Sequence, residues 1–232
     1  MAAAGSGERL GASGPKAFVP LAGRPMVEWS LDALRACESV GSIVVACPPG
    51  HAHGLTGDDL TFVDGGATRS QSVANALAGA DTELVAIHDA ARPLITAALV
   101  EALVADLEAD PEAAGVIAAA PVTDTLKRAG DPAGGSSGHF YSHSVQNRPL
   151  EIERTLDRST LWAAQTPQVF RTEVLRTALA SAADPDAATD EAMLLEAAGR
   201  KVLIHPVAEP NLKVTTPLDL RLAELLLGDR SR

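Results

Sequence analysis

Residues 83–122 read ELVAIHDAARPLITAALVEALVADLEADPEAAGVIAAAPV, and this stretch decides the fold class. It begins with a short apolar run, continues with apolar residues at three- and four-residue spacing, and ends in a second apolar run. Short runs rich in valine and isoleucine indicate buried strands, and the spacing between them indicates an amphipathic helix. Strand, helix and strand in succession predict a parallel sheet with helices on its faces.

The same alternation extends over most of the chain. The pattern predicts further strands at 42–47, 60–64 and 201–207, and helices at 26–37, 69–80, 172–183, 187–199 and 217–228. We therefore expect an α/β domain whose mostly parallel sheet is covered on both faces. Residues 129–155 break the pattern, because they open with glycine, serine and proline and lack helical spacing, which predicts a loop or an arm.

Composition narrows the classes of function. A chain of 232 residues with 46% hydrophobic and 21% charged residues fits a single globular enzyme domain. Its 19 basic and 30 acidic residues give a net charge of -11, which argues against binding to nucleic acid or to an anionic membrane. No apolar run as long as a membrane span and no signal-peptide pattern is visible, so we expect a cytoplasmic protein. Cys37 and Cys47 lack metal-ligand spacing and are predicted to be reduced core residues.

The glycine-rich opening, AAAGSGERLGASGPK at residues 2–16, is the first candidate for a site. Backbone N–H groups of such a loop can surround phosphates, and Arg9 and Lys16 add positive charge. The stretch is neither a Walker A motif nor the GxGxxG of dinucleotide-binding proteins. A flexible amino terminus is the alternative interpretation.

The second candidate is HDAARP at residues 88–93, which directly follows a predicted strand. Ligands bind beyond the carboxyl ends of strands in such sheets, and an aspartate at that position, Asp89, suits a metal ion. The planar guanidinium of Arg92 suits an anion. The alternative is that Asp89 caps the helix that begins near Thr96.

The third candidate is DGGATRSQSV at residues 64–73. Gly65 and Gly66 allow the backbone to approach a flat ligand, and Arg69 and Ser72 lie at the start of a helix, which favours anions. A plain turn with a serine cap is the alternative.

The fourth candidate is NLKVTTPLDL at residues 211–220. Pro217 suits the first turn of a helix, which leaves Lys213 just ahead of it. Only four of the 19 basic residues are lysines, so a lysine here suggests a need for a compact charge. A solvated lysine is the alternative.

Together these stretches resemble the 2-C-methyl-D-erythritol 4-phosphate cytidylyltransferase family over nearly the whole chain. The resemblance rests on seven stretches in the family's order: AAAGSGERLG-x3-PK, GGATRSQSV, HDAARP, APVTDTLKR, LDRSTLWAAQTPQVF, TDEA and NLKVTTPLDL. It implies that CTP and methylerythritol phosphate react to give the cytidine diphosphate derivative and pyrophosphate. Ribitol 5-phosphate, or another sugar or polyol phosphate, is the nearest alternative acceptor.

The resemblance also implies roles for individual residues. Arg9, Lys16 and Lys213 would surround the CTP phosphates and support catalysis, with a magnesium ion (Mg2+) oriented by Asp89. The residues that would contact the nucleotide are Ala4, Gly5, Gly7, Gly65, Gly66, Arg69 and Ser72. Those that would bind the acceptor are Asp89, Arg92, Thr125, Arg158 and Thr166.

The implied fold is a Rossmann-like nucleotidyltransferase domain over residues 1–232, with a protruding arm over 125–160 that is exchanged in a homodimer. The chain departs from the family in two places. Only Met1 and three alanines precede Gly5, so we expect either a start that is placed too late or a shortened first strand. The segment 130–153 is longer than usual for the family and matches no part of it.

Two other classes of protein share parts of this pattern. A nicotinamide-dependent oxidoreductase requires GxGxxG after a full strand and an acidic residue about 20 positions later, which the opening does not provide. A catalytically silent sugar-nucleotide-binding module does not require Lys16, Asp89 and Lys213, and all three are present.

Overall fold

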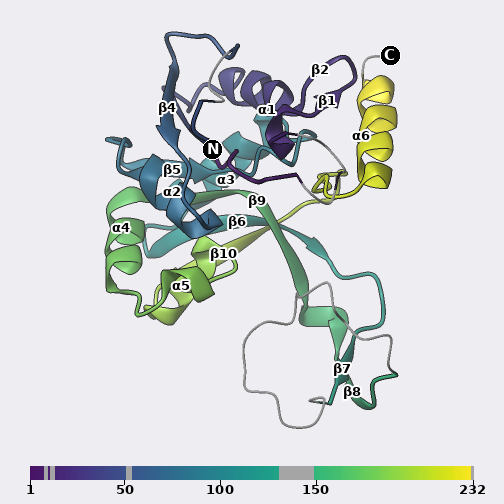
Figure 1. Ribbon diagram of the computed structural model, residues 1–232. Helices are drawn as coiled ribbons and strands as arrows, with labels where there is room; N and C mark the ends of the chain where they lie inside the picture. Colours follow the sequence, from purple (N-terminus) through teal and green to yellow (C-terminus); the bar gives the residue numbers. More distant parts are fainter. Residues whose placement is uncertain (8–9, 11–13, 51–53, 131–148, 231–232) are drawn as a thin grey trace. The chain divides into compact units, whose positions relative to one another are not determined.

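The computed structural model describes residues 1–7, 10, 14–50, 54–130 and 149–230 (Figure 1). The chain forms two compact units, which we describe separately. The larger unit comprises Met1–Ala119 and Ala164–Arg232, and the smaller one comprises Ala120–Ala163.

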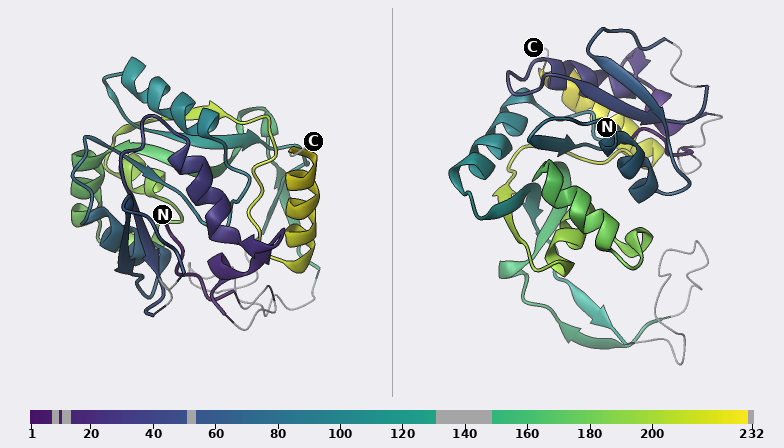
Figure 2. Two further views of the ribbon diagram at one scale, coloured as in Figure 1. Left: turned by 90° about the horizontal axis from the view of Figure 1, so that it is seen from above. Right: turned by 90° about the vertical axis from the view of Figure 1, so that its left-hand side faces the viewer.

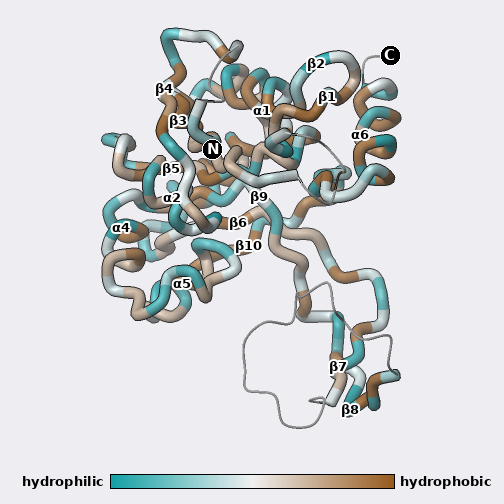
Figure 3. The backbone as a smooth tube through the Cα atoms, viewed as in Figure 1, coloured by the Kyte–Doolittle hydropathy of each residue, from teal (hydrophilic) through white to brown (hydrophobic). Residues whose placement is uncertain are grey.

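Short hydrophobic strands form the centre of the larger unit. They are β3 (Ile43–Cys47), β4 (Leu60–Asp64), β5 (Leu84–Ile87), β6 (Ala113–Pro121), β9 (Trp162–Arg171) and β10 (Lys201–Pro206). Strands β3 and β4 pair in parallel, and the other four lie in the order β10-β6-β9-β5. Strand β10 is parallel to β6, but β9 is antiparallel to β5, so the sheet is mixed where the sequence predicts mostly parallel pairing. The hydropathy colouring in Figure 3 shows hydrophobic stretches along β3 and β6.

The first residues of the chain join these two groups of strands. Ala2 forms parallel bridges with Ala46, in β3, and with Asp89, just after β5. The N–H of Ala2 donates to the carbonyl of His88 at 2.8 Å, and the N–H of Ala3 donates to the carbonyl of Ala46 at 2.8 Å. A very short segment therefore occupies the position of a first strand between β3 and β5.

Helices begin and end close to the predicted positions. They are α1 (Met26–Arg35), α2 (Arg69–Leu77), α3 (Ala97–Ala109), α4 (Thr172–Ser181), α5 (Glu191–Ala197) and α6 (Pro217–Arg230). Thr68, Thr96 and Asp190 precede α2, α3 and α5, and each side chain accepts a hydrogen bond from a backbone N–H of the first turn. None of the helices in the described part of the chain combines the length and the apolar character that a bilayer span requires.

The helices cover both faces of the sheet, as the sequence predicts. Residues of α2, α4 and α5 form one hydrophobic cluster with Ile117 of β6 and Phe170 of β9. Residues of α3 pack against the neighbouring side chains Val116 and Val169, which point to the opposite face because side chains alternate along a strand. Helices α4 and α5 lie side by side in Figures 1 and 2. The free cysteines Cys37 and Cys47 are buried.

A small antiparallel hairpin lies beside α6 in Figures 1 and 2. It consists of β1 (Pro20–Leu21) and β2 (Arg24–Pro25). Leu21 packs in a cluster with residues of α6 and with Val214, which precedes that helix. This cluster anchors the segment that carries Lys213.

The smaller unit contains a second antiparallel hairpin. It pairs β7 (Lys127–Ala129) with β8 (Ile152–Thr155), and the 3-10 helix Arg158–Thr160 follows. Residues 131–148, which include most of the unusual segment 130–153, lie outside the described residues. The predicted arm over 125–160 thus coincides with a separate compact unit, and its exchange between subunits remains a prediction.

Close packing between β6 and β9 requires glycine at position 115. A Cβ atom on Gly115 would lie 2.2 Å from Cδ1 of Phe170, which is fully buried. We expect Gly115→Ala to lower the free energy of unfolding by about 1–3 kcal/mol, because Phe170 has no room to move. Denaturant unfolding measures the change, with Gly79→Ala as the control, since the nearest atom there is 3.6 Å away. Equal stability of the two variants would contradict this packing.

Candidate active site

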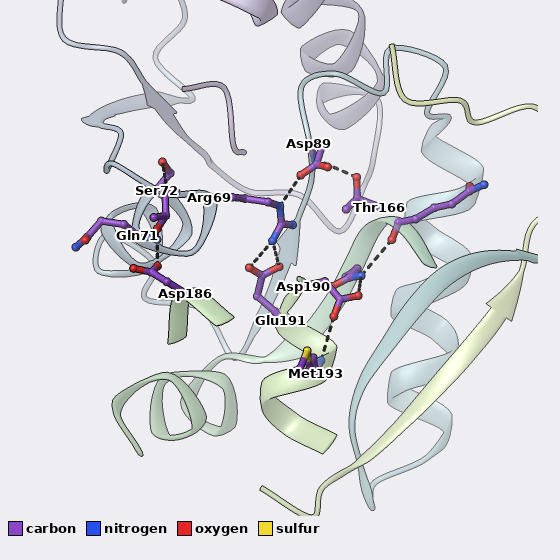
Figure 4. A network of polar contacts seen from close by, with 12 residues as sticks. Arg69, Gln71, Ser72, Asp89, Thr166, Asp186, Asp190, Glu191 and Met193 are labelled. Atoms are coloured by element: carbon purple, nitrogen blue, oxygen red, sulfur yellow. Dashed lines mark hydrogen bonds and ion pairs between the residues drawn. The ribbon is translucent and has the colours of Figure 1, made fainter. Parts of the chain in front are cut away.

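Asp89 lies directly after β5 and is 6% exposed. Its Oδ1 accepts a hydrogen bond from Arg69 Nε at 3.0 Å, and its Oδ2 accepts one from Lys213 Nζ at 2.6 Å. Burial by itself raises the pKa of Asp89, but the two cations outweigh burial and hold this pKa well below its usual value. Asp89 is therefore an ionised carboxylate held between residues of α2 and of the segment before α6. Figure 4 shows it between Arg69 and Thr166.

Arg69 joins Asp89 to a second buried carboxylate. Its Nη1 lies 2.7 Å and 2.9 Å from the two carboxylate oxygens of Glu191, which is 1% exposed at the start of α5. Burial raises the pKa of Glu191, and Arg69 offsets part of that rise. The charges thus alternate along Glu191, Arg69, Asp89 and Lys213. Figure 4 shows Glu191, Arg69 and Asp89. Sequence reasoning missed Glu191, although the TDEA motif that contains it was a signal.

A chain of hydrogen-bonded neutral side chains contacts Asp89 through its backbone N–H. Its N–H donates to Thr166 Oγ1 at 3.0 Å, and Thr166 Oγ1 lies 3.2 Å from His88 Nδ1. His88 Nε2 lies 3.2 Å from Ser30 Oγ, which in turn can donate to the carbonyl of Arg92. This chain is satisfied throughout when Thr166 donates to Nδ1 and Nε2 carries the imidazole proton. Burial lowers the pKa of His88 to about 3, in keeping with a neutral ring.

The segment before α6 is tied to β9 and to Arg92. Asn211 Nδ2 donates to Gln165 Oε1 at 3.0 Å and to the carbonyl of Thr166 at 2.9 Å. The carbonyl of Asn211 accepts from Arg92 Nη1 at 2.7 Å. Among the described residues, Nε of Arg92 is buried and has no hydrogen-bond partner.

The two glycine-rich stretches meet at Gly65 and Ala4. A Cβ on Gly65 would lie 2.2 Å from the Cβ of Ala4, so only glycine permits this approach. The N–H of Gly66 donates to Ser72 Oγ at 3.0 Å, which folds the turn onto the first turn of α2. Within the opening, the N–H of Lys16 donates to the carbonyl of Gly5 at 2.9 Å, and that of Leu10 donates to Gly7 at 2.9 Å.

The structure brings several predicted site residues together and separates others. Arg69, Asp89, Thr166 and Lys213 are in direct contact. Thr125 and Arg158 belong to the smaller unit, where Arg158 Nη1 donates to the carbonyl of Thr123. Arg9 lies outside the described residues.

For three of the candidate stretches, the alternative interpretation without a binding or catalytic role is wrong. The α3 cap is Thr96 and not Asp89, and the α2 cap is Thr68 and not Ser72. Lys213 is not merely solvated, because its ammonium contacts a buried carboxylate.

The donor set limits how a magnesium ion could be held. The described residues contain no group of three histidine, cysteine, aspartate or glutamate side chains suited to a metal ion. Asp89 alone supplies carboxylate oxygens beside Lys213, and Glu191 is fully paired with Arg69. Magnesium often takes one or two protein carboxylates and completes its shell with substrate phosphates and water. Asp89 is the carboxylate that such a shell would use, and its two oxygens here accept hydrogen bonds from Arg69 and Lys213.

Nearly the whole chain matches one known family. The family model described as IspD, 2-C-methyl-D-erythritol 4-phosphate cytidylyltransferase, matches residues 1–137 and 142–229. Within the segment 130–153 it leaves only residues 138–141 unmatched, so the prediction that this segment matches no part of the family is wrong. The chain belongs to this family. The 2-C-methyl-D-erythritol 4-phosphate cytidylyltransferase of Dechloromonas aromatica (strain RCB) is 40% identical over 240 residues, which cover 98% of this chain and 96% of the relative.

Two further proteins extend the comparison. The bifunctional enzyme IspD/IspF of Anaeromyxobacter dehalogenans (strain 2CP-C) is 43% identical over 234 residues, which are 98% of this chain but 56% of that relative. The crystal structure of the cytidylyltransferase from Thermus thermophilus has a TM-score of 0.71 at 34% identity, covering 94% of this chain and 96% of that one. Membership of the cytidylyltransferase family confirms the resemblance and the α/β nucleotidyltransferase fold.

The buried His88 makes stability depend on pH. The unfolded chain binds a proton on this residue below about pH 6.5, whereas the folded protein resists doing so until about pH 3. Because the unfolded state binds more protons in this window, stability falls as pH falls, by up to about 1.4 kcal/mol per pH unit. We expect His88→Gln to flatten the decline in Tm between pH 6.5 and 5.

The wild-type protein, measured at the same pH values, is the reference. An unchanged dependence in His88→Gln would contradict the neutral, buried imidazole.

Proposed function

We propose that this chain transfers the cytidylyl group of CTP to 2-C-methyl-D-erythritol 4-phosphate at the cluster around Asp89. A phosphate oxygen of the acceptor attacks the α-phosphorus of CTP in line, the bond from that phosphorus to the β-phosphate oxygen breaks, and pyrophosphate leaves. Membership of the cytidylyltransferase family supports the reaction. The observation that carries its location is the contact of Lys213 with the buried carboxylate of Asp89.

Little covalent chemistry falls to the protein in phosphoryl transfer, so positioning and charge supply the catalysis. Lys213 holds an ammonium at a fixed place, and its side chain is 41% exposed, which leaves it accessible to a phosphate. We assign Lys213, Lys16 and Arg9 to the triphosphate, where they stabilise charge that builds on the α-phosphoryl oxygens. A chain with a net charge of -11 needs such a local concentration of cations.

The glycine-rich turns would bind the nucleoside. Gly65 and Gly66 present backbone close to Ala4, and Ser72 orients the turn from α2. We assign the recognition of cytosine and ribose to these residues together with Arg69, Gly5 and Gly7. Backbone groups at fixed positions favour one base, because another base leaves some of them unpaired.

The acceptor would lie between Asp89 and Arg92. Arg92 is fixed by its hydrogen bond to the carbonyl of Asn211, and Thr166 lies against the backbone of Asp89. We assign Thr125 and Arg158 to the acceptor as well, from the partner subunit of a homodimer with exchanged arms. A bound magnesium ion would be held by Asp89 and would neutralise phosphate charge.

Turnover with defined substrates tests the proposal. The protein is incubated with magnesium, CTP and either methylerythritol phosphate or ribitol 5-phosphate, and pyrophosphate release is followed. We expect methylerythritol phosphate to be the preferred acceptor, and ATP or GTP to react roughly a hundredfold or more slowly than CTP. Comparable turnover with a purine nucleotide, or a preference for ribitol phosphate, would contradict the assignment.

Mixed dimers test the shared site. If Arg158 serves the partner's site and Lys213 its own, Lys213→Ala and Arg158→Ala homodimers each carry a lesion at both sites. In a mixed dimer both lesions fall in one site and the other is intact, so about a quarter of all sites should recover after co-refolding. Activity of the mixture measures the recovery. A mixture that stays inactive, although exchange of subunits is demonstrated, would place Arg158 in its own chain's site.

A further inference from the structure

Lys213 lies in a segment that has no regular secondary structure. Residues 207–216 connect β10 to α6 and contain neither helix nor strand. The hydrogen bonds of a helix or a sheet therefore do not fix the backbone here, and specific contacts must do so. A catalytic ammonium at the end of a flexible side chain needs a fixed backbone, since a displacement of about 1 Å can cost roughly a hundredfold in rate.

The Asn211 side chain supplies one of these contacts. Asn211 is 4% exposed, and its Nδ2 donates to both Gln165 Oε1 and the carbonyl of Thr166. Two acceptors at one end of the amide require the NH2 group there, which settles the orientation of the side chain. Its Oδ1 is buried without a hydrogen-bond partner among the described residues, so the two donated bonds are what hold the side chain.

A second contact follows on the other side of Lys213. The N–H of Val214 donates to the carbonyl of Ala91 at 2.8 Å, and the Val214 side chain is fully buried. Lys213 thus lies between two anchored residues, one held on β9 and one on the HDAARP turn. The Asn211 anchor leads back to Asp89, because Thr166, which Asn211 contacts, accepts the N–H of Asp89. Lys213 itself contacts the carboxylate of Asp89.

We infer that Asn211 is a positioning residue that sets the ammonium of Lys213 and the guanidinium of Arg92 relative to Asp89. The side-chain amide holds the segment on β9, and the carbonyl of the same residue accepts a hydrogen bond from Arg92. The inference rests on the proposed function, in which Lys213 acts on the CTP phosphates and Arg92 on the acceptor.

Asn211 is linked to Lys213 through the segment that its side chain holds, and to Arg92 through its carbonyl. Loss of each link predicts a distinct kinetic effect of Asn211→Ala. Misplaced Lys213 should lower kcat by roughly 10- to 100-fold. Misplaced Arg92 should raise the KM for methylerythritol phosphate several-fold. The KM for CTP should stay within about twofold, because no hydrogen bond joins Asn211 to the described residues of the glycine-rich turns. The isosteric Asn211→Asp should be at least as impaired, since an oxygen then faces the two acceptors.

A double-mutant cycle with Lys213→Ala separates positioning from a general loss of structure. If Asn211 acts through Lys213, adding Asn211→Ala to Lys213→Ala should change kcat by less than about threefold. Leu103→Ala is the control for stability, because Leu103 is buried in the α3 cluster and contacts none of these residues. That variant should melt at a lower temperature with near-wild-type kcat at 25 °C. Multiplicative losses in the cycle, or a Lys213→Ala variant with wild-type kcat, would overturn the inference.

Urea unfolding of the wild type, the Asn211→Ala and Lys213→Ala variants and the double variant gives a readout that does not depend on activity. In the Asn211→Ala background, the shift of the urea midpoint caused by Lys213→Ala should shrink by at least half, because the contact of Lys213 with Asp89 is already loosened. An undiminished shift would overturn the positioning role. A wild-type protein that does not turn over CTP and methylerythritol phosphate would instead overturn the proposed function, and the urea cycle would still decide the role of Asn211.

Discussion

The burial of one ionised carboxylate, Asp89, is the constraint on which the site depends. A charge that is 6% exposed is tolerated only when ion pairs and hydrogen bonds replace its water. Arg69 comes from 20 residues earlier and Lys213 from 124 residues later to meet this need. The start of α2 and the segment before α6 are therefore fixed to the end of β5, and a substrate bound at Asp89 would meet cations from both.

This arrangement adds little net stability to the fold. Taking ion pairs out of water costs about as much as their attraction returns, so buried pairs contribute little net stability, while the loss of one partner is costly. Loss of Arg69 would be especially costly, because Glu191 is almost fully buried and Arg69 is its ion-pair partner among the described residues. The neutral chain through Thr166 and His88 then holds Asp89 without adding a charge. The result is a preorganised set of charges in a chain that is acidic as a whole.

The sequence predicted the elements of the fold more completely than their pairing. Strands β3 to β6 and helices α1 to α6 follow from apolar spacing, and Pro217 marks the start of α6 as expected. The antiparallel direction of β9 could not be predicted, because the spacing of side chains along a strand is the same in either direction. The sequence allowed for a shortened first strand, but it could not predict that Ala2 bridges to Ala46 and Asp89, since one residue shows no periodicity.

For the site, the sequence by itself determined which motifs carry charge and which family they resemble, and these motifs contain Asp89, Lys213 and Arg69. Only the tertiary structure decided their partners. Glu191 and Asn211 lie 122 and 119 residues from the arginines that they contact, and no local pattern encodes a contact across such a separation. Helix and strand follow from interactions between near neighbours in the chain, whereas the pairing of a buried charge depends on which distant segments the fold brings to the same edge of the sheet.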